Sequence, residues 1–264
     1  MKKYWLIIRN TWDEYLVYRL NFVLWRVRVI IRFLITYFLW SSIYTGTQPY
    51  FGYTRETMLT YVLMVYLVSN FVFATRTQDV GSEINEGKLT NYLLKPINYF
   101  ASLASRDISD KLLNFGCTIV ELIAIFILLK PQFIFQTNPV VLILVLMAFV
   151  GGIVIYFMVS LLLSFIGFWT TEVWVTRFIF IILIDFLAGN FFPIDILPPV
   201  ILRILLLTPL PYIYYFPVKL YLGNLTVFSI FQGFTVLVFW TLLLIFLVSF
   251  VWKKGLRVYS AEGR

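Results

Sequence analysis

The sequence has no histidine, and its single cysteine, Cys117, lies within an apolar run. Without imidazole groups the chain has no Ser–His catalytic pair and no histidine ligand for zinc. One thiol forms neither an intramolecular disulfide nor a cysteine cluster for a metal ion. Charged residues make up only 13% of the 264 residues, whereas soluble globular domains contain about 25%. These absences exclude histidine-based catalysis, metal sites of the Cys or His type and a water-soluble fold.

Apolar residues dominate what is present, at 61% of the chain, and 20% of the residues are aromatic. A bilayer core about 30 Å thick requires roughly 20 apolar residues in a helix. An outer-membrane barrel would instead show short alternating segments, and the sequence has none. We therefore predict an all-α polytopic membrane protein, a single domain over residues 1–264 with six transmembrane helices. The predicted spans are 29–45, 57–74, 112–129, 140–168, 176–192 and 231–251.

Two of these stretches depart from a simple span. Arg28 and Arg32 lie four residues apart near the start of the first span, on one helix face from which both side chains reach the headgroups. The stretch 140–168 has 29 residues, which at 1.5 Å per residue exceeds the bilayer core. We expect its Gly151-Gly152 pair to mark a bend.

The positions of lysine and arginine predict the orientation of the chain. With the N-terminus inside, all but four of the 21 basic residues lie in inner segments; the exceptions are Arg55, Lys130, Arg203 and Lys219. Because cytoplasmic segments carry an excess of Lys and Arg, both termini are predicted to be cytoplasmic. The net charge of +8 is then mainly a topology signal. We expect no nucleic-acid partner, since that would need a basic patch on a soluble face.

Residues 1–26 are predicted to contain an amphipathic helix on the inner membrane surface. Between residues 4 and 20, Trp5, Ile8, Trp12 and Leu16 form one helical stripe, whereas the charged residues lie largely elsewhere. A helix of this kind lies in the interface and binds membrane lipids. A simple anchor and a mechanical role are equally compatible with the pattern.

The cytoplasmic loop 75–111 carries signals of a short helix. Ser82 is placed to cap its N-terminus, acidic residues such as Glu83 follow in the first turn, and Gly87 provides a stop. The segment Thr90–Leu94 forms an apolar turn that ends before Pro96.

A second, polar helix is predicted over about 101–111, leading into the next span. Long connections with helices of their own are usually functional. We therefore interpret the loop as a docking element for a cytosolic partner, and the alternative is a solvated connector.

The outer segment 193–223 contains six of the ten prolines. The apolar pieces between them are too short to span a bilayer, so we predict a pair of re-entrant or interfacial helices. Tyr212, Tyr214 and Tyr215 are expected at the headgroups, where one end of the ring is wet.

Two carboxylates fall within predicted spans. Glu121 is in the third span and Asp185 in the fifth, and an ionised carboxylate there costs about 2.5–3.5 kcal/mol. Asp185 has no basic residue within a helical turn of its own helix, so it is either protonated or paired across helices. Both a substrate pathway and structural hydrogen bonding fit these residues. A membrane-embedded enzyme or lipid-modifying protein that uses Glu121 and Asp185 is the alternative function.

Ordered blocks of sequence resemble one protein family. The inner loop carries Glu83-Ile84-x-x-Gly87-x-Leu89-x-x-x-Leu93-Leu94-Lys95-Pro96-Ile97, and the end of the fifth span carries Ala188-Gly189-x-x-Phe192-Pro193-x-Asp195-x-Leu197-Pro198. Leu210-Pro211-Tyr212 and Pro217-x-x-x-Tyr221-x-Gly223 follow. Together the blocks resemble ABC-2 type permeases, the membrane subunits of bacterial ATP-binding-cassette exporters, in a subgroup whose substrates are mostly unassigned. Ala188 stands where a serine would be expected.

The resemblance implies half of a transporter in the bacterial inner (plasma) membrane. A cytosolic ABC ATPase dimer would bind ATP and Mg²⁺, and a second permease, identical or homologous, would complete the pathway. The chain itself would be a non-catalytic transport subunit with no cofactor or metal site. Residues implied in ATPase coupling are Ser82, Glu83, Ile84, Gly87, Lys88, Leu89 and Pro96, with Glu172 in a shorter inner turn. Residues assigned to the substrate pathway are Glu121, Asp185 and Phe192.

Overall fold

The structure is a computed structural model, and it describes residues 2–17, 19–44, 48–223 and 225–260. Over these ranges the chain is helical and has no β-strand, so the all-α prediction is confirmed. The α-helices are α1 (Lys2–Val17), α2 (Arg19–Ile43), α3 (Arg55–Val72), α4 (Asp79–Asn85), α5 (Thr90–Leu93), α6 (Tyr99–Leu129), α7 (Pro139–Phe165), α8 (Val173–Leu187), α9 (Pro199–Leu206), α10 (Tyr215–Tyr221) and α11 (Val227–Val258). Short 3₁₀ helices are η1 (Ile166–Phe168), η2 (Ile194–Ile196) and η3 (Leu210–Tyr212).

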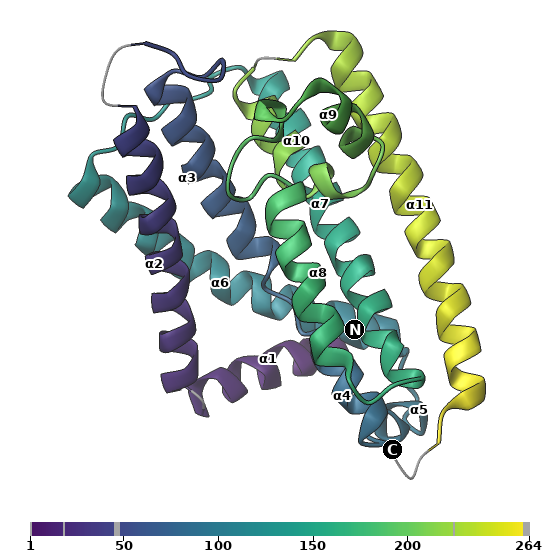
Figure 1. The fold of residues 1–264 in the computed structure, drawn as a ribbon. Helices are drawn as coiled ribbons and strands as arrows, with labels where there is room; N and C mark the ends of the chain where they lie inside the picture. Colours follow the sequence, from purple (N-terminus) through teal and green to yellow (C-terminus); the bar gives the residue numbers. More distant parts are fainter. Residues whose placement is uncertain (1, 18, 45–47, 224, 261–264) are drawn as a thin grey trace.

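The long helices run alternately between two ends of the molecule (Figure 1). One end, which we call the base, carries α1, α4, α5 and the last turns of α11. The opposite end, which we call the cap, consists of residues 193–223 with α9 and α10. The polar inner loop and the proline-rich segment therefore lie at opposite ends of the helical bundle.

Within the part of the chain that the structure describes, three helices, α6, α7 and α11, are long and apolar enough to cross a membrane by length and composition. α2 has 25 residues, but Arg26, Arg28 and Arg32 interrupt its apolar face. α8 has only 15 residues, or about 22 Å at 1.5 Å per residue, which is shorter than the bilayer core. Length and composition alone therefore support three of the six predicted spans, and the other three stay a prediction.

The separate helix predicted over 101–111 is wrong, because these residues belong to α6. The Asn98 side chain caps α6 by accepting a hydrogen bond from the Ala101 N–H at 3.0 Å. No proline follows within the helix, so it continues without a break from Tyr99 to Leu129.

The Gly151-Gly152 pair lies inside the continuous helix α7, where it permits close packing. A Cβ atom on Gly152 would lie 2.6 Å from the Tyr212 carbonyl oxygen, and one on Gly151 would lie 2.6 Å from the Leu237 side chain. Only glycine leaves room for the cap backbone at this point of α7.

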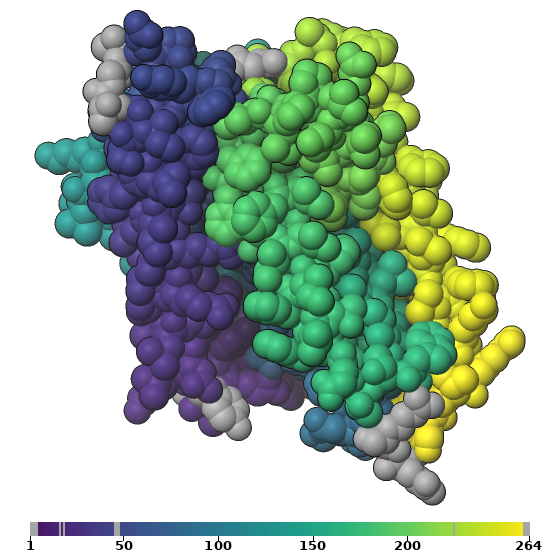
Figure 2. All heavy atoms as spheres, in the orientation of Figure 1, coloured from purple at the N-terminus to yellow at the C-terminus, as the bar shows by residue number. Residues whose placement is uncertain are grey.

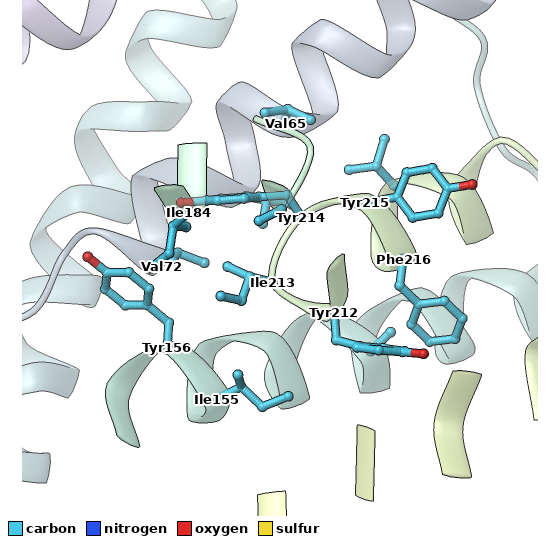
Figure 3. Close-up of a cluster of buried hydrophobic side chains, with 14 of the residues drawn as sticks. Val65, Val72, Ile155, Tyr156, Ile184, Tyr212, Ile213, Tyr214, Tyr215 and Phe216 are labelled. Atoms are coloured by element: carbon cyan, nitrogen blue, oxygen red, sulfur yellow. The ribbon is translucent and has the colours of Figure 1, made fainter. Parts of the chain in front are cut away.

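The cap contains two short helices as expected, but the predicted location of its tyrosines is wrong. Tyr212, Tyr214 and Tyr215 are 2%, 0% and 6% exposed. They pack with Ile155 of α7 and Ile184 of α8 in the largest core cluster (Figure 3). Burial of each large side chain contributes roughly 1.5–3 kcal/mol. The cap is therefore folded into the bundle, and these three tyrosine side chains are buried in protein, so that neither end of their rings faces water.

Helix α1 packs on the first half of α6. The Trp12 indole N–H donates to the Ser109 carbonyl at 3.1 Å, and the Ser109 hydroxyl donates to the Ile8 carbonyl at 2.9 Å. Trp5, from the same predicted stripe, is exposed, and the side chain of Leu16 lies outside the described residues. Part of the predicted stripe is thus used for contact with protein.

A buried ion pair fixes the cap to the start of α3. Lys219 Nζ lies 2.6 Å from Asp195 Oδ2 and donates to the Tyr53 hydroxyl at 2.7 Å, and this hydroxyl donates to Asp195 at 2.9 Å. Lys219 is 9% exposed. The three groups connect α10, η2 and the loop before α3.

We predict that Asp195→Asn lowers the stability of the protein by about 1–3 kcal/mol, because the buried ammonium loses its charged acceptor. Thermal denaturation in detergent measures the effect. The control is Glu56→Gln, which removes an exposed carboxylate in the first turn of α3. Equal melting temperatures for the two variants would contradict a stabilising role of the pair.

Candidate functional site

The short helix predicted in the loop 75–111 exists as α4, but Ser82 is not its N-cap. α4 begins at Asp79 with Gln78 in the cap position, and the Ser82 hydroxyl donates to the Asp79 carbonyl at 3.0 Å. The earlier start follows from Thr77, whose hydroxyl and carbonyl bond to α7. The Gly87 stop is confirmed, since its φ is +71° and its N–H donates to the Ile84 carbonyl at 3.2 Å.

Thr77 is held by two serines of α7, and Arg177 of α8 binds the same two serines. The Thr77 hydroxyl lies 2.5 Å from the Ser160 hydroxyl, and the Thr77 carbonyl accepts from the Ser164 hydroxyl at 2.6 Å. The Arg177 guanidinium donates to both serine hydroxyls at 2.7 Å. This buried contact fixes the start of α4 to α7 and α8.

Glu83 faces the protein rather than solvent. Its carboxylate accepts from Arg106 at 2.8 Å and from the Tyr99 hydroxyl at 3.2 Å, and both partners belong to α6. Its side chain is 12% exposed. Glu83 therefore links α4 to α6.

The residues that follow α4 are attached to the C-terminal end of α11. The Tyr259 hydroxyl donates to the Gly87 carbonyl at 2.7 Å and lies 2.9 Å from the Thr90 hydroxyl. Ile84 and Leu89 are buried with Phe165 and Phe168 of α7 and η1. Neither Tyr259 nor Arg106 carries a local pattern that would identify it as a partner of this loop.

The shorter inner turn lies directly beside α4. The Asn85 side-chain amide donates to the Thr171 carbonyl at 3.1 Å. A Cβ on Gly81 would lie 2.9 Å from Val173, so the two segments are in close contact. Together they present an exposed group of side chains that we call the base surface: Ser82, Glu86, Lys88, Trp169 and Glu172. Pro96, after α5, is exposed as well.

Glu121 belongs to a polar network inside the bundle. Arg26 forms an ion pair with it, and the Tyr66 hydroxyl donates to the same carboxylate. Arg26 also donates to the side-chain oxygens of Asn70 at 2.7 Å and Asn114 at 2.9 Å. Arg26 is 5% exposed. Its buried guanidinium therefore connects α2 to side chains of α3 and α6.

Asp185 is paired across helices, which is one of the two states expected for it. Arg32 of α2 lies 2.6 Å from its Oδ2, and the Asn190 side-chain amide donates to its Oδ1 at 2.7 Å. Arg32 also lies 4.8 Å from the ring centre of Phe191. The expectation that Arg32 extends to the headgroups is therefore wrong, because a carboxylate of α8 binds it.

A cavity of about 920 Å³ opens between α1, α2, α3 and α8. In Figure 2 the surface is hollowed between the purple helices α1 and α2 and the green helix α8. Asp185 and Arg32 line the cavity, and Arg28 and Trp25 lie on the same wall. Glu121 and Phe192 are not among its lining residues. Phe192 instead packs near Phe186, with a ring-centre distance of 6.5 Å.

The model of the ABC-2 family transporter proteins matches residues 30–263, which is most of the chain. The chain belongs to the ABC-2 transporter family. No curated protein matches the sequence significantly. Members of this family are membrane components of transporters that work with ABC ATPases and are generally not catalytic themselves. The apolar helices α6, α7 and α11 agree with a membrane location for this ABC-2 protein.

The Arg26–Glu121 pair yields a stability prediction for the ABC-2 protein. Glu121→Ala leaves a buried guanidinium without its counter-ion, which costs about 3–5 kcal/mol. In the double variant Arg26→Met/Glu121→Leu no charge remains unpaired, so we expect it to be more stable than either single variant. Thermal denaturation in detergent gives the comparison. Additive losses in the double variant would contradict the pairing.

Proposed function

We propose that this ABC-2 protein is the permease subunit of an ATP-driven exporter, forming half of the substrate pathway. Separate cytosolic ATPases would bind ATP and Mg²⁺, and a second permease, identical or homologous, would complete the complex. The observation that carries the proposal is the base surface. Two segments almost 90 residues apart in the chain, represented by Ser82 and Glu172, contribute to one exposed face held against the bundle.

The proposed topology has the base in the cytoplasm of a bacterial cell and the cap outside its inner membrane. The distribution of lysine and arginine supports this orientation, since only Arg55, Lys130, Arg203 and Lys219 are left outside. α2, α3 and α8 would cross the bilayer together with α6, α7 and α11, which run between the same two ends (Figure 1).

Charge pairing supports a membrane crossing by α2 despite its arginines. An unpaired charge within the bilayer is costly, but Arg26 is bound by Glu121 and Arg32 by Asp185. Both carboxylates are engaged by arginine, which also removes the main support for a membrane-embedded enzyme that uses them.

The connections of α4 suggest how force would pass from an ATPase to the spans. Glu83 attaches α4 to α6, and Tyr259 attaches the residues after α4 to α11. Thr77 attaches the start of α4 to two serines of α7, which Arg177 of α8 also binds. A displacement of α4 would therefore move four helices rather than bend a loop. Such rigid transmission is what alternating access requires of a coupling element.

Binding of the ATPase is testable on the base surface. Lys88→Glu and Glu172→Arg reverse exposed charges there, and we expect each to reduce the ATPase recovered with the tagged full chain from native membranes by at least about tenfold, as for strong interface residues. The matched control is Arg203→Glu, an exposed charge reversal in α9. Equal recovery with all three variants would exclude the base surface as the docking site.

Coupling is testable separately from docking. Glu83→Arg places a cation against Arg106, and Gly87→Val forces a branched residue to a φ of +71°. We expect both to uncouple ATP hydrolysis from transport while the chain still inserts in the membrane. Tyr259→Phe removes one hydroxyl group and keeps the ring. We expect it to lower the number of substrates transported per ATP hydrolysed, but less than Glu83→Arg or Gly87→Val does. Normal transport in all three variants would contradict transmission through α4.

A further inference from the structure

The charged side chains that line the cavity differ in whether they have an ion-pair partner. Each carboxylate that lines the cavity has a basic partner: Asp185 with Arg32 at 2.6 Å, Glu14 with Arg76 at 2.5 Å, Asp110 with Arg76 at 3.4 Å and Asp79 with Arg106 at 3.7 Å.

Arg28 is the exception among the charged residues of this lining. It is exposed and has no carboxylate within ion-pair distance among the described residues. One turn further along α2, Arg32 keeps 41% of its side chain exposed, although its partner Asp185 is only 9% exposed. Arg28 is therefore the cationic group of the lining that is free to bind a ligand, and Arg32 is partly accessible beside it.

The remaining wall near Arg28 is apolar and aromatic. Trp25 and Phe22 lie one and nearly two turns before Arg28 on α2, and Phe178 and Ile182 of α8 line the same cavity. The volume of about 920 Å³ lies within the usual range for small-molecule sites. On the wall formed by α2 and α8, the carboxylate of Asp185 is already bound by Arg32, whereas Arg28 has no ion-pair partner among the described residues and can bind an anionic headgroup.

We propose that the cavity binds an amphiphile with an anionic phosphate or carboxylate headgroup, held by Arg28 with support from Arg32 and with its tail along Trp25 and Phe178. This inference rests on the proposed function, because it names the substrate class of that pathway. The headgroup could belong to a phospholipid of the membrane or to a soluble amphiphile, and the two share the same chemistry at Arg28.

The test uses the purified full chain in phosphatidylcholine nanodiscs and two diazirine probes with the same dodecyl tail. One probe carries a phosphate and the other a trimethylammonium group, and mass spectrometry locates the crosslinks after irradiation. We expect the phosphate probe to label the peptides of α2 and α8 in preference to the ammonium probe. Equal or stronger labelling by the ammonium probe would overturn the proposal without the need for any variant.

Variants then assign the headgroup contact. A hydrogen bond to a charged group corresponds to about a 10- to 100-fold change in affinity, so Arg28→Ala should weaken phosphate labelling at least about tenfold and Arg28→Lys much less. The matched control is Arg19→Glu, an exposed residue at the start of α2 that does not line the cavity. Undiminished labelling of Arg28→Ala would overturn the proposal.

Adding phosphatidylglycerol to the nanodiscs separates the two sources of the headgroup. Competition with the phosphate probe identifies the membrane lipid as ligand, and undiminished labelling identifies a soluble amphiphile. The labelling needs no ATPase. A failure of the labelling would therefore contradict the proposed ligand of the cavity but not the proposed ATPase docking at the base surface. Conversely, loss of the ATPase partner with intact labelling would contradict the permease function but not the site.

Discussion

The arrangement of this ABC-2 protein depends on the pairing of charges along α2. Arg26 and Arg32 lie in a mostly apolar helix, and each meets a carboxylate of another helix, Glu121 of α6 and Asp185 of α8. A charge in a low-dielectric interior is tolerated only when it is paired and hydrogen-bonded. The two pairs therefore position α2 against α6 and α8, and the Arg32–Asp185 pair lies where α2 and α8 line the cavity.

At the base, hydrogen bonds from hydroxyl groups and the Glu83–Arg106 ion pair hold the elements together. Arg177 is buried among hydroxyls, and Thr77 joins the chain before α4 to α7 through two hydrogen bonds. Glu83 and Tyr259 complete the attachment on the other sides of α4. Because each contact reaches a different long helix, α4 is part of the bundle and not a flexible connector. This rigidity is the physical basis for proposing that α4 transmits movement.

The elements that could be predicted from the sequence are those that residues close together in the chain determine. Apolar runs locate the long helices, and Gly87 ends α4 because its backbone adopts a positive φ. The errors come from contacts between distant segments. Ser82 has the chemistry of a cap, but attachment of the preceding residues to α7 starts the helix earlier. Tyr214 resembles a headgroup residue, yet the cap folds inward and buries it. The partner of Asp185 is on another helix, and no local pattern names it.

The central claim is that the base, with α4, faces the cytoplasm. Single cysteines at Lys88 and Arg203, each in a Cys117→Ala background, report this directly through a membrane-impermeant maleimide applied to intact cells. Both native side chains are exposed, one at the base and one in the cap. The account predicts that the Arg203→Cys protein is labelled at once and that the Lys88→Cys protein is labelled only after the membrane is permeabilised. Labelling of Lys88→Cys from outside intact cells would contradict it.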